Sequence, residues 1–97
     1  MIKSFKDKAT SDFFHGRSSS KVRKLPTQIL DSATFKLDIL NAATSLNDLK
    51  SPPGNRLEPL RGELQGFNSI RINAQWRIIF RWHESDAYDV QIIDYHK

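Results

Sequence analysis

The amino-acid sequence predicts a single α+β domain, residues 1–97, in which an N-terminal strand and helices pack on one face of a small antiparallel sheet. Its length suits one compact domain, because single domains commonly contain roughly 100–150 residues. Apolar residues recur at helical spacing in the middle of the chain, whereas three later segments alternate apolar and polar residues. Helices followed by a meander of strands are typical of α+β folds.

The most regular helical pattern lies over residues 26–43. Pro26 suits the first turn of a helix, where the N–H group that proline lacks is not needed. The sequence places Asp31, Lys36 and Asp38 on the polar side of this helix. One apolar stripe with steps of three and four residues is expected to face the sheet: Leu30, Ala33, Leu37 and Leu40.

Shorter elements are predicted on either side of this helix. Residues 1–5 are interpreted as a first strand, and 6–16 as a short helix. The basic, serine-rich segment 17–24 is either a loop or the frayed start of the next helix. The segment 56–60 is a candidate edge strand, because Pro59 cannot donate a hydrogen bond within a sheet.

The first hairpin of the meander is predicted from strands over 69–73 and 76–82. A three-residue turn, 73–75, keeps the apolar residues of both strands on one face, whereas a two-residue turn would mix the two faces. This register sets Arg71 directly opposite Arg77, on the face away from the helices. On the other face it pairs Ile72 with Trp76 and Ile70 with Ile78.

The last strand, over 88–95, is predicted to return along the strand 76–82. A polar loop of sequence HESDA then brings Trp82 opposite Tyr88. Tyr95 falls diagonally from Arg77, on the same face and within reach of a long side chain. The remaining pairs in this register are Arg81 with Asp89, Phe80 with Val90, Ile78 with Ile92, and Arg77 with Ile93.

The composition favours an acidic partner. The chain has 15 Lys and Arg against 11 Asp and Glu, a net charge of +4 and a pI near 9.6, which is frequent in proteins that bind nucleic acid. The alternative is an ordinary soluble basic domain. The sequence has no cysteine, which excludes disulfides and thiolate metal sites. No apolar run suits a signal peptide or a membrane span, so a cytoplasmic protein without membrane contact is expected.

The opposed pair Arg71 and Arg77 admits two interpretations. Long side chains can spread into water, so that the repulsion between them is close to zero. Alternatively, the two guanidinium groups form a seat for phosphate, which arginine binds in a bidentate manner without losing its charge.

Three motifs follow one another in the second half of the chain: NRLEPL-x-G, then SIRIN-x-QWR-x-x-F, then a terminal DYH. With these motifs the sequence closely resembles the HigB-type toxins, the "killer" branch of the RelE-like superfamily. The resemblance covers nearly the whole chain, includes the opening MIKSF, and is strongest over 51–96.

This resemblance implies a RelE-like fold and a toxin of a type II toxin–antitoxin system. Such toxins enter the ribosomal A site and cut messenger RNA there, by attack of the ribose 2′-OH on the adjacent phosphate. No cofactor or metal is implied. The implied partners are the ribosome, messenger RNA and a helix-turn-helix antitoxin of the HigA type, whose complex with the toxin binds operator DNA.

The family's site residues carry over position by position. The arginine of the QWR run matches Arg77, and the basic residue of the family's PLKG turn matches Arg61. The terminal DYH matches Asp94, Tyr95 and His96. In the predicted register Asp94 falls on the core side, where it would orient His96 or close the chain end.

Glu58 departs from the family pattern. The best-known HigB-type toxins have a histidine immediately before PLKG, and this chain has Glu58 before PLRG. A carboxylate can serve as a general base, or Glu58 is simply a solvated charge on an edge strand. His96 titrates nearest neutral pH, and Tyr95 can stack on a base or carry a proton. The sequence therefore leaves open which of these three residues is the base.

RNA binding is expected to extend beyond the cut site, with Arg71 beside it. Basic residues are concentrated in the first quarter of the chain, where they either contact RNA phosphates or form an ordinary solvated surface. These residues are Lys3, Lys6, Lys8, Arg17, Lys21, Arg23 and Lys24. A non-cleaving module that blocks translation, and a pure interaction domain, remain the alternatives to an enzyme.

Overall fold

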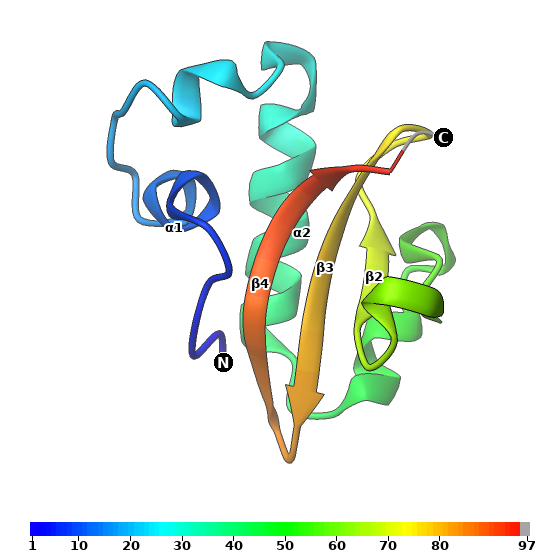
Figure 1. The fold of residues 1–97 in the computed structure, drawn as a ribbon. Coiled ribbons are helices and arrows are strands. Elements are labelled where there is room, and N and C mark those ends of the chain that lie inside the picture. Colours follow the sequence, from blue (N-terminus) through cyan, green and yellow to red (C-terminus); the bar gives the residue numbers. More distant parts are fainter. Residues whose placement is uncertain (96–97) are drawn as a thin grey trace.

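In the computed structural model, which describes residues 1–95, four strands form one antiparallel sheet in the order β1-β2-β3-β4. The strands are β1 (Glu58–Pro59), β2 (Asn68–Arg71), β3 (Trp76–His83) and β4 (Asp86–Asp94). The long helix α2 (Leu30–Ala42) lies behind the sheet in Figure 1. The predicted α+β architecture is therefore confirmed. We call the opposite side of the sheet its outer face.

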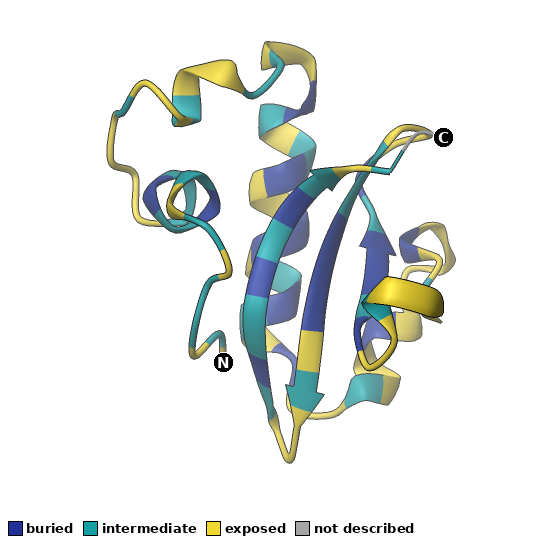
Figure 2. Cartoon of the chain, in the orientation of Figure 1, coloured by how far each residue is buried: buried dark blue, intermediate teal, exposed yellow. Residues whose placement is uncertain are grey.

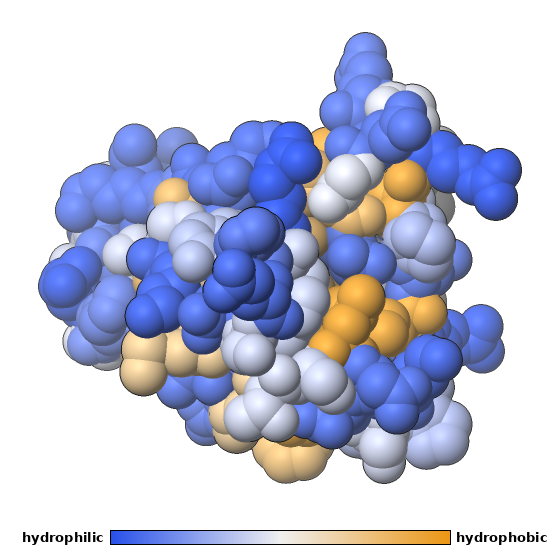
Figure 3. Space-filling model, turned by 90° about the horizontal axis from the view of Figure 1, so that it is seen from below, coloured by the Kyte–Doolittle hydropathy of each residue, from blue (hydrophilic) through white to orange (hydrophobic). Residues whose placement is uncertain are grey.

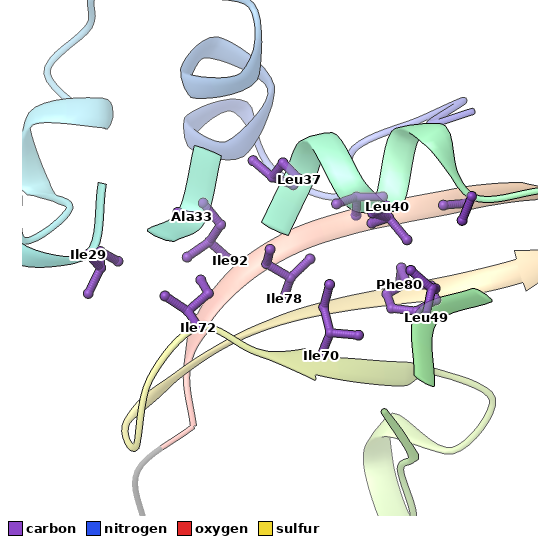
Figure 4. Close-up of a cluster of buried hydrophobic side chains, with 13 residues drawn as sticks. Ile29, Ala33, Leu37, Leu40, Leu49, Ile70, Ile72, Ile78, Phe80 and Ile92 are labelled. Atoms are coloured by element: carbon purple, nitrogen blue, oxygen red, sulfur yellow. The ribbon is translucent and has the colours of Figure 1, made fainter. Parts of the chain in front are cut away.

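The main hydrophobic core lies between α2 and the sheet. Ala33, Leu37 and Leu40 on α2 are fully buried, as their spacing predicted. Figure 4 shows them above the apolar side chains of the strands, with Leu49 closing one end. The sheet contributes Ile70, Ile72, Ile78, Phe80, Ala87, Val90 and Ile92. Burial of this apolar surface is the main stabilising contribution to the fold.

The helix α2 begins later than the predicted residue 26. Pro26 has extended backbone angles, and a 3₁₀ turn, η2 (Thr27–Ile29), precedes the α-helix. As a result Ile29 is buried, with 1% of its surface exposed, and Leu30 is only half-buried. The first position of the predicted stripe is thus wrong by one residue.

Lys36 is buried, which corrects the expectation that it lies on the polar side of α2. Its Nζ donates a hydrogen bond to Oδ1 of Asn55, which is itself completely buried. The Asn55 amide nitrogen in turn donates to the carbonyl oxygens of Leu49 at 3.1 Å and Ser51 at 3.2 Å. Burial lowers the pKa of Lys36, because it disfavours the charged ammonium.

The N-terminal segment forms no regular strand. Ile2 and Phe5 make isolated parallel bridges to Ala87 and Val90 of β4. Since these two apolar residues are three positions apart, a regular strand would point them to opposite faces. The following helix α1 is also shorter than the predicted 6–16. It spans Lys8–Phe14, with an Asp7 carboxylate that accepts the backbone N–H of Thr10 at 3.0 Å.

The predicted register of the first hairpin is confirmed. Arg71 pairs with Arg77 and Ile70 with Ile78. Ile72 donates its backbone N–H to the Trp76 carbonyl oxygen at 2.9 Å, which agrees with the expected three-residue turn.

The second hairpin follows the prediction only in part. Arg77 pairs with Ile93 and Ile78 with Ile92, as expected. Beyond Ile79 a β-bulge in β4 shifts the register by one residue, so that Trp82 pairs with Ala87 instead of Tyr88.

The bulge places two residues of β4, Asp89 and Val90, against Phe80 alone. Asp89 adopts a positive φ of 53°, as bulges often require. The turn between β3 and β4 consequently contains only two residues, 84 and 85, in place of the longer predicted loop.

The edge strand is reduced to β1, and the chain after it folds back over the outer face. The 3₁₀ turn η5 (Gly62–Leu64) lies in front of β2 in Figure 1 and is largely exposed in Figure 2. Beneath this segment Leu60, Phe67 and Ile79 form a second, smaller apolar cluster. The outer face is therefore partly covered, instead of being fully solvent-exposed as the sequence suggested.

The surface seen from below in Figure 3 is mainly hydrophilic, with apolar patches between the polar side chains. Across the part of the chain that the structure describes, no helix has both the length and the hydropathy needed to span a bilayer.

Candidate active site

Arg77 is held in a defined position on the outer face. Its Nη1 lies 2.8 Å from Oε1 of Glu58 and donates a hydrogen bond to Oγ of Ser69 at 3.1 Å. Only 16% of the Arg77 side chain is exposed, against 48% of the Glu58 side chain. The sheet explains this meeting, because Glu58 pairs with Ser69, and Ser69 lies diagonally across from Arg77.

Tyr95 lies beside the same guanidinium group. The centre of its ring is 5.0 Å from Cζ of Arg77, within the range of a cation–π interaction. The backbone N–H of Tyr95 donates to the Gln75 carbonyl oxygen at 2.7 Å. The predicted placement of Tyr95 beside Arg77 is therefore confirmed, and Arg77 is flanked by a carboxylate and an aromatic ring.

A pocket of about 420 Å³ opens next to Tyr95. Arg61 is exposed and belongs to its wall, so the structure brings together the candidates from the PLRG turn and from the chain end. Apolar, basic, acidic and aromatic side chains all contribute to the lining, which consists of Leu60, Arg61, Gly62, Glu63, Leu64, Ile93, Asp94 and Tyr95.

Asp94 pairs with Trp76 at the end of β4, as the predicted register requires, but its side chain is exposed and not buried in the core. Its Oδ2 accepts a hydrogen bond from Nε2 of Gln75 at 3.0 Å. His96, the remaining candidate from the DYH motif, lies outside the described residues.

The opposed arginines differ in their surroundings. Arg77 is bound to Glu58, whereas the half-buried Arg71 makes no side-chain hydrogen bond or ion pair with another residue of 1–95. This asymmetry reduces the repulsion between the two guanidinium groups, because one of them has a carboxylate beside it. It also leaves Arg71 with its hydrogen-bonding capacity unused by the rest of the described chain.

Two of the basic residues predicted to bind RNA form ion pairs within the protein. Lys8 and Arg17 bind the carboxylate of Asp12 at 3.2 and 3.4 Å, and only 3% of the Asp12 side chain is exposed. Burial favours the neutral acid, but hydrogen bonds from Lys8, Ser19 and Arg17 outweigh it, so the pKa of Asp12 is lowered. The other five candidates are also exposed: Lys3, Lys6, Lys21, Arg23 and Lys24.

Ser69 is the residue of this site that sequence reasoning missed. It is completely buried, and its hydroxyl oxygen accepts the hydrogen bond that orients Arg77. A signal was present, because Ser69 stands two positions before Arg71 in a strand and must share its face. The contact with Glu58 had no such signal, since β1 could not be registered against β2 from the sequence.

The arrangement suits a phosphodiester ligand. Guanidinium groups bind phosphate oxygens bidentately, and the carboxylate of Glu58 can accept a proton beside them. Among residues 1–95 there is no group of three or more His, Cys, Asp or Glu side chains that would hold a metal ion.

Solved structures share this fold at low sequence identity. A mutant of YafQ from E. coli superposes with a TM-score of 0.60 and 14% identity, over 97% of this chain and 93% of the other. The YoeB-YefM complex from Staphylococcus aureus gives a TM-score of 0.60 and 15% identity, over 100% and 99%. The chain thus has the same fold as these solved structures.

The sequence comparisons are more specific. The family model described as the RelE-like toxin of type II toxin-antitoxin system HigB matches residues 3–96. Toxin HigB-1 of Vibrio cholerae serotype O1 is 41% identical over 97 residues, which is 100% of this chain and 99% of that protein. Endoribonuclease HigB of Proteus vulgaris is 36% identical over 96 residues, 99% and 100% of the two chains. The chain belongs to the HigB-like toxin family.

Proposed function

We propose that this toxin is an endoribonuclease that cuts messenger RNA in the ribosomal A site. The observation that carries the proposal is the position of Arg77, fixed by Glu58 and Ser69 and stacked on Tyr95 beside an open pocket. The Proteus vulgaris relative is an endoribonuclease by name, which supports the same activity.

In the proposed reaction the ribose 2′-OH attacks the adjacent phosphorus atom. The O2′–P bond forms and the P–O5′ bond breaks, which leaves a 2′,3′-cyclic phosphate and a free 5′-OH. Arg77, assisted by Arg61 and Arg71, stabilises the negative charge that develops on the phosphoryl oxygens. Their fixed charge is suited to this role, because arginine stays protonated throughout.

The proton steps need one acceptor and one donor. Glu58 is a candidate acceptor, because its carboxylate stands beside the guanidinium that would hold the phosphate. Tyr95 and His96 are the candidates for the second role, with Asp94 beside them in the chain. The RNA phosphate and Glu58 would share Arg77, so substrate binding loosens the Glu58–Arg77 contact and releases the carboxylate.

The proposed partners follow from the family. A helix-turn-helix antitoxin of the HigA type neutralises the toxin, and their complex contacts operator DNA through the antitoxin. Among the structures with this fold, RelBE2 of Mycobacterium tuberculosis is described as a toxin-antitoxin complex, and the Staphylococcus aureus structure is a complex of YoeB with YefM. Because the proposed target is the ribosome, the proposed site of action is the cytoplasm. Residues 1–97 are proposed to act as a single domain.

The test uses purified ribosomes programmed with one messenger RNA, with the products mapped by primer extension. The wild-type toxin is expected to give breaks at codon spacing, and the double variant Glu58→Gln, Arg77→Ala is expected to give none. Lys50→Gln, an exposed substitution in the 3₁₀ turn η3 (Leu46–Lys50), serves as the matched control. Inhibition without breaks would identify a non-cleaving blocker, and absence of any effect would leave only an interaction domain.

A further inference from the structure

Two more basic side chains lie on the outer face, at Phe67. Cζ of Arg81 is 4.2 Å and Nζ of Lys6 is 5.0 Å from the centre of the Phe67 ring, distances at which the face of an aromatic ring attracts a cation. Phe67 is buried, whereas Lys6 and Arg81 are exposed. We call these three residues the Phe67 cluster.

The guanidinium of Arg81 lies directly against the backbone of Gly66. A Cβ atom added at Gly66 would stand 2.8 Å from Nη1 of Arg81, and Gly66 also has a positive φ of 95°. A side chain at this position would therefore displace the arginine. The absence of a side chain at Gly66 therefore leaves room for the guanidinium next to the aromatic ring.

The negative charge near the cluster is limited. Asp89 binds Nε of Arg81 at 3.5 Å, but both side chains are about half exposed, at 47% and 49%, so the pair is weak. Asp7 uses both carboxylate oxygens within the protein, at the backbone of Thr10 and at Nε2 of Gln91. Lys6 makes no ion pair within residues 1–95, and its backbone N–H is fixed to the Val90 carbonyl oxygen at 2.9 Å.

The Phe67 cluster is continuous with the candidate active site. Phe67 belongs to the second apolar cluster, against which Tyr95 and Ile93 pack from the pocket side. The two cations lie 4.2 and 5.0 Å from the same ring centre, which places both positive charges around one side chain of the outer face. A strand of RNA that leaves the pocket along the outer face would pass over them.

We propose that Lys6 and Arg81 form a second phosphate subsite, which binds the backbone of the messenger RNA strand beyond the bond that is cut. The proposal rests on the proposed function, because it takes the strand in the pocket to be messenger RNA. It adds Arg81 as a binding residue and assigns Phe67 and Gly66 the task of holding its guanidinium in place.

The test measures binding of 2′-O-methyl RNA, which lacks the attacking hydroxyl, by fluorescence anisotropy at several salt concentrations. A dinucleotide fills only the pocket, whereas an octanucleotide reaches the Phe67 cluster. The variants Lys6→Met and Arg81→Met keep the apolar part of each side chain and remove its charge. For the octanucleotide, each substitution is expected to reduce the magnitude of the slope of log affinity against log salt by about 0.7. This is the value for one phosphate contact to a single strand. Dinucleotide binding should not change.

Asp89→Asn provides a variant with the opposite expectation. Asparagine tolerates the positive φ at this bulge, and the substitution releases Arg81 from its carboxylate, so octanucleotide affinity should rise severalfold. Lys50→Gln removes one exposed charge elsewhere and controls for the change in net charge. Thermal unfolding of each variant shows that the fold is retained.

The subsite would be overturned if the salt dependence of octanucleotide binding weakened no more in Lys6→Met and Arg81→Met than in Lys50→Gln. Equal losses of affinity for the dinucleotide and the octanucleotide would also overturn it. Weakened binding to ribosomes with unchanged octanucleotide binding would assign the cluster to ribosomal RNA and equally overturn it. Because the RNA in this assay is not cleaved, failure of the proposed nuclease activity appears separately, as absent breaks in primer extension.

Discussion

Glu58 and Arg77 form an ion pair of 2.8 Å across an intervening strand, since they belong to β1 and β3 and meet above β2. The residue beneath them is Ser69, whose small side chain leaves room for both and whose hydroxyl accepts a hydrogen bond from Arg77. Arg77, whose side chain is only 16% exposed, is thus positioned by three strands at once.

Arg77→Lys is expected to lower the rate of messenger RNA cleavage on the ribosome by about 100-fold, the scale on which loss of one transition-state contact is felt. A lysine keeps the charge but has no planar fork to bind Glu58, Ser69 and a phosphate together. Single-turnover cleavage with saturating ribosomes measures the rate. A rate within a few-fold of wild type would show that point charge alone suffices at this position.

Arg77→Ala is expected to lower the free energy of unfolding by about 1 kcal/mol, because it removes the hydrogen bond to the buried hydroxyl of Ser69. A double-mutant cycle with Glu58→Ala in urea should give a coupling energy of at most about 1 kcal/mol, since Glu58 is half exposed. A coupling several times larger would contradict the solvent-screened pair described here.

Asp12 is expected to contribute to acid sensitivity. Its pKa in the folded protein is lowered by hydrogen bonds from Lys8, Ser19 and Arg17, which outweigh the opposing effect of burial. The unfolded chain then binds more protons, so stability is present above the ordinary carboxyl pKa of about 3.9 and is lost as pH falls through the folded value.

Asp12→Asn removes this contribution and provides the check. The variant should melt at a lower temperature at pH 7, and its melting temperature should depend less on pH below about 4 than that of the wild type. Parallel melting curves for the two proteins from neutral to acidic pH make the comparison. Parallel pH profiles would mean that Asp12 is not the group responsible.

Asn55→Ala is expected to destabilise the fold by about 2–3 kcal/mol, because buried polar groups then lose their partners. The ammonium of Lys36 loses its acceptor, and the carbonyl oxygens of Leu49 and Ser51 lose their donor. Lys36→Met in the Asn55→Ala background should recover part of this loss, since it removes the buried charge. Chemical denaturation of the single and double variants measures both effects, and an additive further loss would argue against a buried ammonium.

The amino-acid sequence by itself determined the core and the first hairpin. The stripe Ala33, Leu37 and Leu40 follows directly from the period of a helix, and the pairing of Arg71 with Arg77 follows from keeping one face of two strands apolar. Both inferences rest on local periodicity, which requires no knowledge of distant contacts. The placement of Tyr95 beside Arg77 followed from the same alternation, because the bulge at Asp89 lies nearer the start of β4 and leaves the register at its end unchanged.

The tertiary structure alone decided the rest of the site. Packing between segments far apart in the chain produces three features that the sequence did not predict. These are the bulge at Asp89, the burial of Lys36 against Asn55, and the return of Leu60 and Phe67 over the outer face. A pattern of hydrophobicity shows which face of an element is buried but not which element covers it. Glu58 meets Arg77, and Arg81 rests on Phe67, only because a short edge strand and the turn after it fold back over the sheet.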